Sequence, residues 1–443
     1  MAVQASDPGS TRPPPTRPTR SPRSQPALPT STSASSEPSS SGGIRYNSTT
    51  SAPTTSSSSS STFSSRTSLS SLRLSLSQNP HIYDISEIRS ATNNFLAKRH
   101  SSSTPCWRCT LRNSDTIVFQ RKLRPHRTLA PSLPSSLLRH RLALLCRSHH
   151  SSVIHLLGAC ISGDHIYLVY DFVPGSNLAN CLRNPRNPAF TALSTWMSRM
   201  QVAADLASGL DYVHNKTGLG NFSLVHNRIK SSSVIVTEPS FNAKICHFGT
   251  AQLCGEVDDE IDEKIATPSS EEEGIGEKKK KAKAPPPPLT RSDSGGAQFE
   301  GARGYMSPEF QASGVGSQKS DVYAFGVVVL ELLSGEEPLR YRFDRRTGEF
   351  ARTSVIDTAR AAAEGGTGRV REWVDRRLKD SFPVEVAERM VRVALECVHV
   401  DPDVRPDMGR VAGKISKWYI ESQIWCDSFL KVSDQISVSL APR

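Results

Sequence analysis

The chain of 443 residues is long enough for a large folded domain, and its net charge of +11 is scattered rather than gathered in a basic stripe with aromatic residues, which argues against nucleic-acid binding. Its nine cysteines, an odd and dispersed set, argue against a disulfide framework and for a reducing compartment. No apolar stretch approaches the ~18–20 residues needed to cross a bilayer.

Residues 1–80 are dominated by Ser, Thr and Pro and contain few large apolar side chains. Such a segment cannot bury enough apolar surface to offset the entropy lost on ordering, so we expect a disordered tail. Its Arg- and Ser-rich, acid-poor start also resembles a plastid transit peptide, although a generic tail is the favoured interpretation.

Order is expected to begin near His81. Hydrophobic periodicity then predicts a short helix, a strand, a longer helix and two more strands, at 83–95, 111–123, 135–148, 153–157 and 166–172 in turn. Cys106 and Cys109 form a lone C-x-x-C without a second pair or histidines at zinc spacing, so we expect no metal or redox site there.

The pattern turns helical after this point, with apolar residues every three or four positions from Trp196 to Val213. A short β segment is predicted at 233–236, followed by mostly helix to about residue 421. Residues 322–333 are apolar on almost all sides, which is typical of a helix buried in the centre of a lobe.

Residues 255–300 break this pattern. They contain acidic runs, the basic run Lys278–Lys281 and the proline run Pro285–Pro288, which together predict a disordered insertion. The basic run could act as a nuclear-import signal, but a solvated charge run is the favoured interpretation. Ser292 and Ser294 are candidate phosphorylation sites, as are the serines of the tail.

Several motifs follow one another in a recognisable order. They are Leu168–Pro174, His226-Asn227-Arg228, His247-Phe248-Gly249, Gly304–Glu309, Lys319–Gly326 and Arg405 in Asp403–Pro406. In this order and spacing, residues 81–421 resemble a protein kinase domain of the plant receptor-like (Pelle-like) family. The LysM receptor-like kinase branch is one candidate within it.

The resemblance implies an α+β, two-lobed kinase fold, with a small β-rich lobe carrying one main helix and a large, mostly helical lobe. The small lobe and hinge would span 81–173 and the large lobe 174–421, with 255–300 inserted in the activation segment and 422–443 as a C-terminal tail. Residues that hold the family fold are present: His226, Phe248, Gly249, Pro308, Glu309, Asp321, Gly326 and Arg405.

The positions that hold ATP in the family are altered in the small lobe. The three places of the glycine-rich loop fall on Arg99, Ser101 and Thr104, where side chains obstruct close approach of the backbone to phosphate. Arg121 stands at the position of the strand lysine. Lys122 follows it, and because side chains alternate along a strand it should face away from the cleft unless a bulge intervenes.

The remaining catalytic positions are altered too. The glutamate that pairs with the strand lysine falls near Arg141, and Arg228 replaces the aspartate that accepts the substrate proton. A guanidinium stays protonated in proteins and cannot act as a base. Ser233 and His247 replace the two magnesium ligands of the family, and neutral imidazole is a poor ligand for this hard cation. We therefore expect no intact catalytic residue and no metal site.

These substitutions predict a pseudokinase, a scaffold or allosteric partner in receptor-like kinase signalling, whose partners are other receptor-like kinases or signalling proteins. The alternative is an active or weakly active ATP-dependent Ser/Thr kinase with unorthodox catalytic residues. No cofactor is expected, although weak metal-free ATP binding stays open through the residues Lys122, Tyr170, Asp171, Phe172 and Val173. We expect a cytoplasmic location, or a peripheral one at the plasma membrane through partners, ahead of plastid or nucleus.

Overall fold

The structure is a computed structural model that describes residues 80–101, 104–123, 135–186, 193–217, 224–256, 300–344 and 348–439. The predicted tail and insertion lie almost entirely outside these residues, and so do Ser292 and Ser294. At the two edges of the insertion, Gly255, Glu256 and Glu300 are described.

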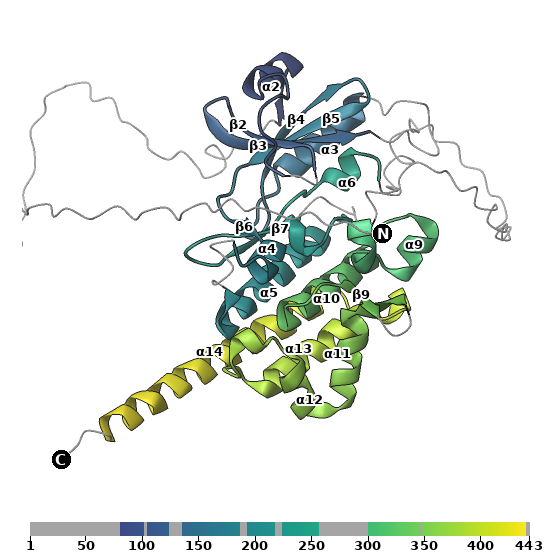
Figure 1. The fold of residues 1–443 in the computed structure, drawn as a ribbon. Coiled ribbons are helices and arrows are strands. Elements are labelled where there is room, and N and C mark those ends of the chain that lie inside the picture. Colours follow the sequence, from purple (N-terminus) through teal and green to yellow (C-terminus); the bar gives the residue numbers. More distant parts are fainter. Residues whose placement is uncertain are drawn as a thin grey trace, which may run out of the picture. The chain divides into compact units, whose positions relative to one another are not determined.

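The small lobe is built on a five-stranded sheet of order β1-β4-β5-β3-β2 (Figure 1). Neighbouring strands are antiparallel except β1, which runs parallel to β4. The strands are β1 (His81–Ile82), β2 (Cys106–Leu111), β3 (Ser114–Lys122), β4 (Leu156–Ser162) and β5 (His165–Asp171). At Gly158 of β4, an added Cβ would lie 1.9 Å from the carbonyl oxygen of His81, so only glycine allows β1 to approach.

Two helices accompany this sheet, as the periodicity predicts. α2 (Ile85–Ala91) buries Ile88, and α3 (Ser135–Cys146) buries Leu142 and Leu145, which lie about one helical turn apart on the same face. The short helix is confirmed with narrower bounds than 83–95, and the longer one nearly as predicted.

The strand that the sequence predicts at 153–157 begins later in the structure. The corresponding strand, β4, starts at Leu156. Val153 instead forms an isolated bridge with Ile245, and the Ile154 amide donates to the Ile245 carbonyl at 2.9 Å. These two residues therefore pair with β8 (Ala243–Ile245) of the large lobe. A short apolar run does not reveal which partner it will pair with.

The large lobe is mostly helical and lies below the sheet in Figure 1. Its helices are α4 (Leu178–Arg183), α5 (Trp196–Asp211), α6 (Thr250–Leu253), α9 (Pro308–Ser313), α10 (Gln318–Ser334), α11 (Val355–Glu364), α12 (Gly366–Trp373), α13 (Val384–Cys397) and α14 (Met408–Ser439). β6 (Ser176–Asn177), β7 (Val234–Val236) and β8 form a small sheet, and β9 (Leu339–Asp344) pairs with β10 (Glu349–Ser354). The two-lobed α+β fold is thus confirmed.

Helix α10 is the central buried helix that the apolar stretch predicts. The side chains of Ser317 and Ser320 form a capping box at its start, and Gly335 ends it in the left-handed conformation with φ 73°. Every side chain from Ala324 to Ser334 is buried. A helix that is covered on all sides is rigid, and it can hold the loops packed against it at fixed positions.

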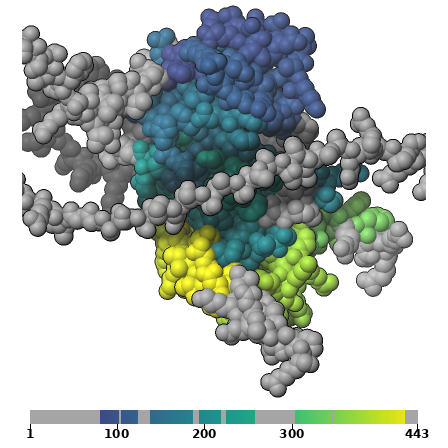
Figure 2. Space-filling view, turned by 90° about the vertical axis from the view of Figure 1, so that its left-hand side faces the viewer, coloured from purple at the N-terminus to yellow at the C-terminus, as the bar shows by residue number. Residues whose placement is uncertain are grey.

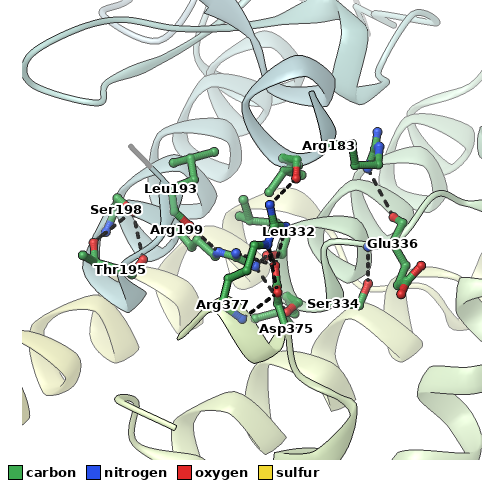
Figure 3. A network of polar contacts seen from close by, with 12 residues as sticks. Arg183, Leu193, Thr195, Ser198, Arg199, Leu332, Ser334, Glu336, Asp375 and Arg377 are labelled. Carbon is green, nitrogen blue, oxygen red and sulfur yellow. Dashed lines mark hydrogen bonds and ion pairs between the residues drawn. The ribbon is translucent and has the colours of Figure 1, made fainter. Parts of the chain in front are cut away.

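A buried polar network holds α5 to the segment after α12 (Figure 3). Arg199, only 1% exposed, donates to Asp375 at 2.6 Å and to the carbonyl oxygens of Leu193 and Leu332, each at 2.8 Å. Arg377 donates to both carboxylate oxygens of Asp375. Because the buried charges are paired and hydrogen-bonded, the network fixes the geometry of the lobe at little net cost.

Helix α14 runs to Ser439, well past the end that the sequence predicts near residue 421. Its C-terminal part projects away from the large lobe in Figure 1, and Figure 2 shows α14 in yellow at the lower edge of that lobe, with the small lobe in purple and blue at the top. Among the described residues, no helix combines the length and apolar character needed to span a bilayer.

Candidate functional site

A cavity of about 640 Å³ lies between the two lobes. Its walls come from the loop before β2, from β3, from the hinge after β5, and from the loops around β7 and β8. These are the places where the sequence motifs put the family's ATP and substrate site. The side chains that line the cavity therefore decide what the domain can do.

The loop that carries the motif His226-Asn227-Arg228, here called the catalytic loop, is anchored to α10 by the buried carboxylate of Asp321. It accepts from the backbone amides of His226 at 2.6 Å and Asn227 at 2.7 Å. The His226 ring donates to the Cys246 carbonyl at 2.9 Å, and burial lowers the pKa of this imidazole to about 4. The backbone of the loop is thus held by the family's structural residues.

Arg228, at the position where the sequence resemblance puts the catalytic base, forms an ion pair with Glu256 inside the cavity. Only 8% of the Glu256 side chain is exposed. Glu256 belongs to the range 255–300 that the sequence assigns to the insertion, and its side chain lines the cleft. The sequence gives no signal for the pair, since the acidic run that begins at Glu256 has the composition of a solvated segment.

His247 lies at the position where the sequence resemblance puts the magnesium-binding aspartate. Its backbone is left-handed, with φ 69°, a region that histidine tolerates better than most residues but at some cost. Its ring packs edge-on against Phe119 with centroids 4.6 Å apart. Burial, followed by the charges of Arg121 and Arg228, lowers the pKa of His247 well below its ordinary value, so the ring is neutral.

The next two residues keep this segment in place. The Tyr170 hydroxyl donates to the Phe248 carbonyl at 2.8 Å. Gly249 has φ 76°, and an added Cβ would lie 2.8 Å from Leu145 of α3. Tyr170 at the back of the cavity is therefore committed to positioning the loop.

The register of β3 determines whether Arg121 or Lys122 faces the cleft. Arg121 lines the cavity, whereas the side chain of Lys122 is exposed and lies outside it. No bulge interrupts the pairing of β3 with β5 at these residues, so the alternation of side chains is strict. Lys122, which the sequence offers as a possible nucleotide contact, therefore lies outside the cavity that Arg121 lines. Arg141, at the place of the helix glutamate, donates to the Gln252 carbonyl at 3.2 Å.

The loop over the cavity carries side chains where the family has glycine. Ser101 and Thr104 line the cavity, and Arg99 does not. The neighbouring His100 lies edge-on to Phe172 of the hinge, with ring centroids 5.6 Å apart. Asp171, Phe172 and Val173 of the hinge also line the cavity, as predicted contacts of a base would.

The residues at the two metal-binding places do not fit magnesium. Ser233 offers a neutral hydroxyl, and the His247 ring is held among cations, whereas magnesium needs hard, anionic oxygen ligands. Across the described part of the chain, no group of three or more His, Cys, Asp or Glu side chains could hold a metal ion. Cys106 and Cys109 are both free thiols.

The end of the activation segment is held by the ion pair of Arg405 with Glu309 and by a hydrogen bond from Tyr305 to Glu331. Arg405 donates to the two carboxylate oxygens of Glu309 at 2.7 and 2.8 Å, and Pro308 opens α9 beside them. Glu331 of α10 is fully buried and accepts from Tyr305 at 2.7 Å. Arg183 contacts it at 2.8 Å, while burial raises the pKa of this carboxyl to about 7.

A family model described as "Protein tyrosine and serine/threonine kinase" matches residues 125–269 and 294–415. Curated relatives include the LysM domain receptor-like kinase 3 of Arabidopsis thaliana, 28% identical over 79% of this chain and 48% of its own length. Protein LYK5 of the same plant is 27% identical over 78% of this chain and 44% of its own. The chain thus spans about half the length of these relatives.

A solved structure described as the pseudokinase domain of BIR2, an immune regulator of the RLK/Pelle family, has a similar fold. The TM-score is 0.52 at 20% sequence identity, and the match covers 80% of this chain and 94% of the other. With the family model matching more than half of its residues, the chain belongs to the family of protein tyrosine and serine/threonine kinases.

Proposed function

We propose that this chain is a catalytically impaired kinase domain, a pseudokinase that acts as a scaffold or allosteric partner in receptor-like kinase signalling. The observation that carries the proposal is the ion pair of Arg228 with Glu256. It places a cation, paired with a buried carboxylate, where phosphoryl transfer requires a proton acceptor.

Two further features support the loss of turnover. Ser233 and His247 cannot hold the magnesium ions that bridge the phosphates of ATP in kinases. Arg121 and Arg141 have the same sign of charge, so the lysine–glutamate ion pair of the family cannot form between these positions. The changes affect proton transfer, metal binding and phosphate positioning together.

The fold residues, in contrast, keep their contacts. Asp321 holds the catalytic loop, and Arg405 holds Glu309. A domain with an intact kinase surface and an altered cleft suits a binding role, and its relatives make receptor-like kinases the favoured partner class. A cytoplasmic site of action, peripheral to the plasma membrane through such partners, follows from that proposal.

The test is a phosphotransfer assay of the full chain with labelled ATP and Mg²⁺ or Mn²⁺, on itself and on a general protein substrate. We expect incorporation no higher than with heat-denatured protein. In parallel, adding the chain to the catalytic domain of an active receptor-like kinase should change that enzyme's rate. Incorporation that disappears in Arg228→Ala would instead establish an unorthodox kinase.

A further inference from the structure

Several buried polar atoms around the interlobe cavity have no hydrogen-bond partner. Six such side-chain atoms occur among the described residues, and four of them belong to cavity-lining residues: Arg121 Nε, Arg228 Nε, Ser233 Oγ and His247 Nδ1. Ser233 is only 1% exposed. A buried polar group without a partner destabilises the fold, so a cluster of them points to a missing ligand.

The charge around these atoms is positive. Lys230 joins Arg121 and Arg228 in the cavity lining, and burial and the two arginines lower its pKa. Arg228 likewise lowers the pKa of Arg121, second to burial. Burial is the main cause of the lowered pKa of Arg121 and of Lys230, and repulsion from the neighbouring cations of the cavity adds to it.

The acids of the cavity do not cancel this charge. Asp321 accepts from the backbone amides of the catalytic loop and from His214. Asp171 contacts His155 at 3.3 Å. Within the described part of the chain, Glu256 is the one cavity carboxylate that pairs with these cations, through Arg228. Arg121 and Lys230 have no carboxylate within ion-pair distance among the described residues.

We propose that this part of the cavity binds a phosphate-bearing anion directly, without a divalent metal, with Arg121, Arg228 and Lys230 supplying the positive charge. Guanidinium groups bind phosphate oxygens through paired N–H donors, and the Ser233 hydroxyl and the free nitrogen of His247 complete the polar wall. Glu256 is an internal competitor that holds Arg228 until the anion displaces it. The inference rests on the proposed loss of magnesium-dependent transfer, since it assigns the same cleft a ligand.

Calorimetric titration of the full chain in EDTA tests the site with three probes: sodium tripolyphosphate, ATP and adenosine. Tripolyphosphate and ATP should bind, and adenosine should not. Excess Mg²⁺ should weaken ATP binding, because the metal occupies the phosphate oxygens that the arginines require. Binding of adenosine as tight as that of ATP would assign the cavity to the base, and binding that requires Mg²⁺ would also overturn the proposal.

Two neighbouring residues supply a matched pair of variants. Arg121→Gln should weaken tripolyphosphate binding by about tenfold or more, the effect of losing a charge-assisted hydrogen bond, while Lys122→Gln should leave it unchanged. An equal loss of affinity in both variants would mean that the anion is attracted by the overall positive charge of the protein and not by a specific site.

Glu256→Gln provides a change in the opposite direction. Removing the competing carboxylate should tighten tripolyphosphate binding several-fold, which a misfolded variant cannot do. Unchanged or weaker binding, with an unaltered melting temperature, would contradict the role of Glu256. Absence of anion binding would leave the proposed pseudokinase function standing, whereas phosphotransfer would remove that function whatever the anion does.

Discussion

A neutral histidine among arginines makes the cleft sensitive to acid. The pKa of His247 lies well below that of an exposed histidine because of burial and the charges of Arg121 and Arg228. The unfolded chain therefore binds the extra proton first, so the stability that depends on neutral His247 is present above about pH 6.5 and is lost as the pH falls. If a histidine stays neutral in the folded state, the free energy of unfolding falls by about 1.4 kcal/mol at one pH unit below the pKa of that histidine in the unfolded chain.

We expect His247→Gln to lose less stability than the wild-type chain between pH 7.5 and pH 5.5, as measured by urea denaturation. His226, with its pKa near 4, adds the same dependence to both proteins. The raised pKa of Glu331 acts in the opposite direction, favouring the folded state at lower pH, and is also common to both. Identical losses in the two proteins would show that His247 takes up its proton without opening the cleft.

For single residues, the spacing of the motifs predicts which residue of this chain stands at each motif position of the kinase family. Strand alternation puts Arg121 and Lys122 on opposite faces of β3, but the sequence alone does not decide which of them faces the cleft, since a bulge would exchange them. The sequence also does not predict the partner of Arg228. That pairing brings together residues 28 positions apart, across a segment whose composition indicates an insertion, and only the folded loop places Glu256 beside the guanidinium.

The network of Arg199, Asp375 and Arg377 makes a prediction at the scale of elements. Asp375→Ala leaves the guanidinium of Arg199 buried without its counter-charge, which should destabilise the fold by about 3–5 kcal/mol. Glu372→Ala is the control, because Glu372 pairs with Arg369 where both side chains are 69% exposed, and such a pair contributes about 0–1 kcal/mol. Chemical denaturation measures both, and equal effects would mean that water reaches Arg199.

Elements with a strong internal signal are predicted well. Helix α10 has a capping box, a glycine stop and an apolar surface all round, so its ends and its burial follow from local rules. The run at 153–157 is predicted less well, because Val153 and Ile154 find their partner in β8, which lies far along the chain. The extent of α14 also escapes the sequence, since the family resemblance ends near residue 421 while the helix continues.

The whole molecule shows that the chemical changes are spread over both lobes while the fold is kept. The small lobe supplies Arg121 and Arg141, and the large lobe supplies Arg228, Ser233 and His247. Motif order is enough to predict the two-lobed fold, because the residues that hold it are those that remain. The binding properties of the cleft are not predictable in the same way, since they depend on which charges remain unpaired after folding.

On the proposed pseudokinase function, a repair confined to one lobe should confer magnesium binding without conferring phosphotransfer. We expect the triple variant Arg228→Asp, Ser233→Asn, His247→Asp to bind ATP more tightly when Mg²⁺ is added, the reverse of the response expected from the wild-type chain, because carboxylate and amide oxygens return to the metal-binding places. Aspartate also tolerates the left-handed backbone at position 247.

Phosphotransfer by this variant should stay at the level of heat-denatured protein. Arg141 still cannot pair with the basic residue of β3, and Ser101 and Thr104 still hold side chains over the place of the phosphates. Calorimetry with and without Mg²⁺ measures the change in ATP binding, and an assay with labelled ATP measures phosphotransfer. Turnover in the triple variant would mean that the small lobe remains competent, and that the proposed loss of phosphotransfer lies in the large lobe alone.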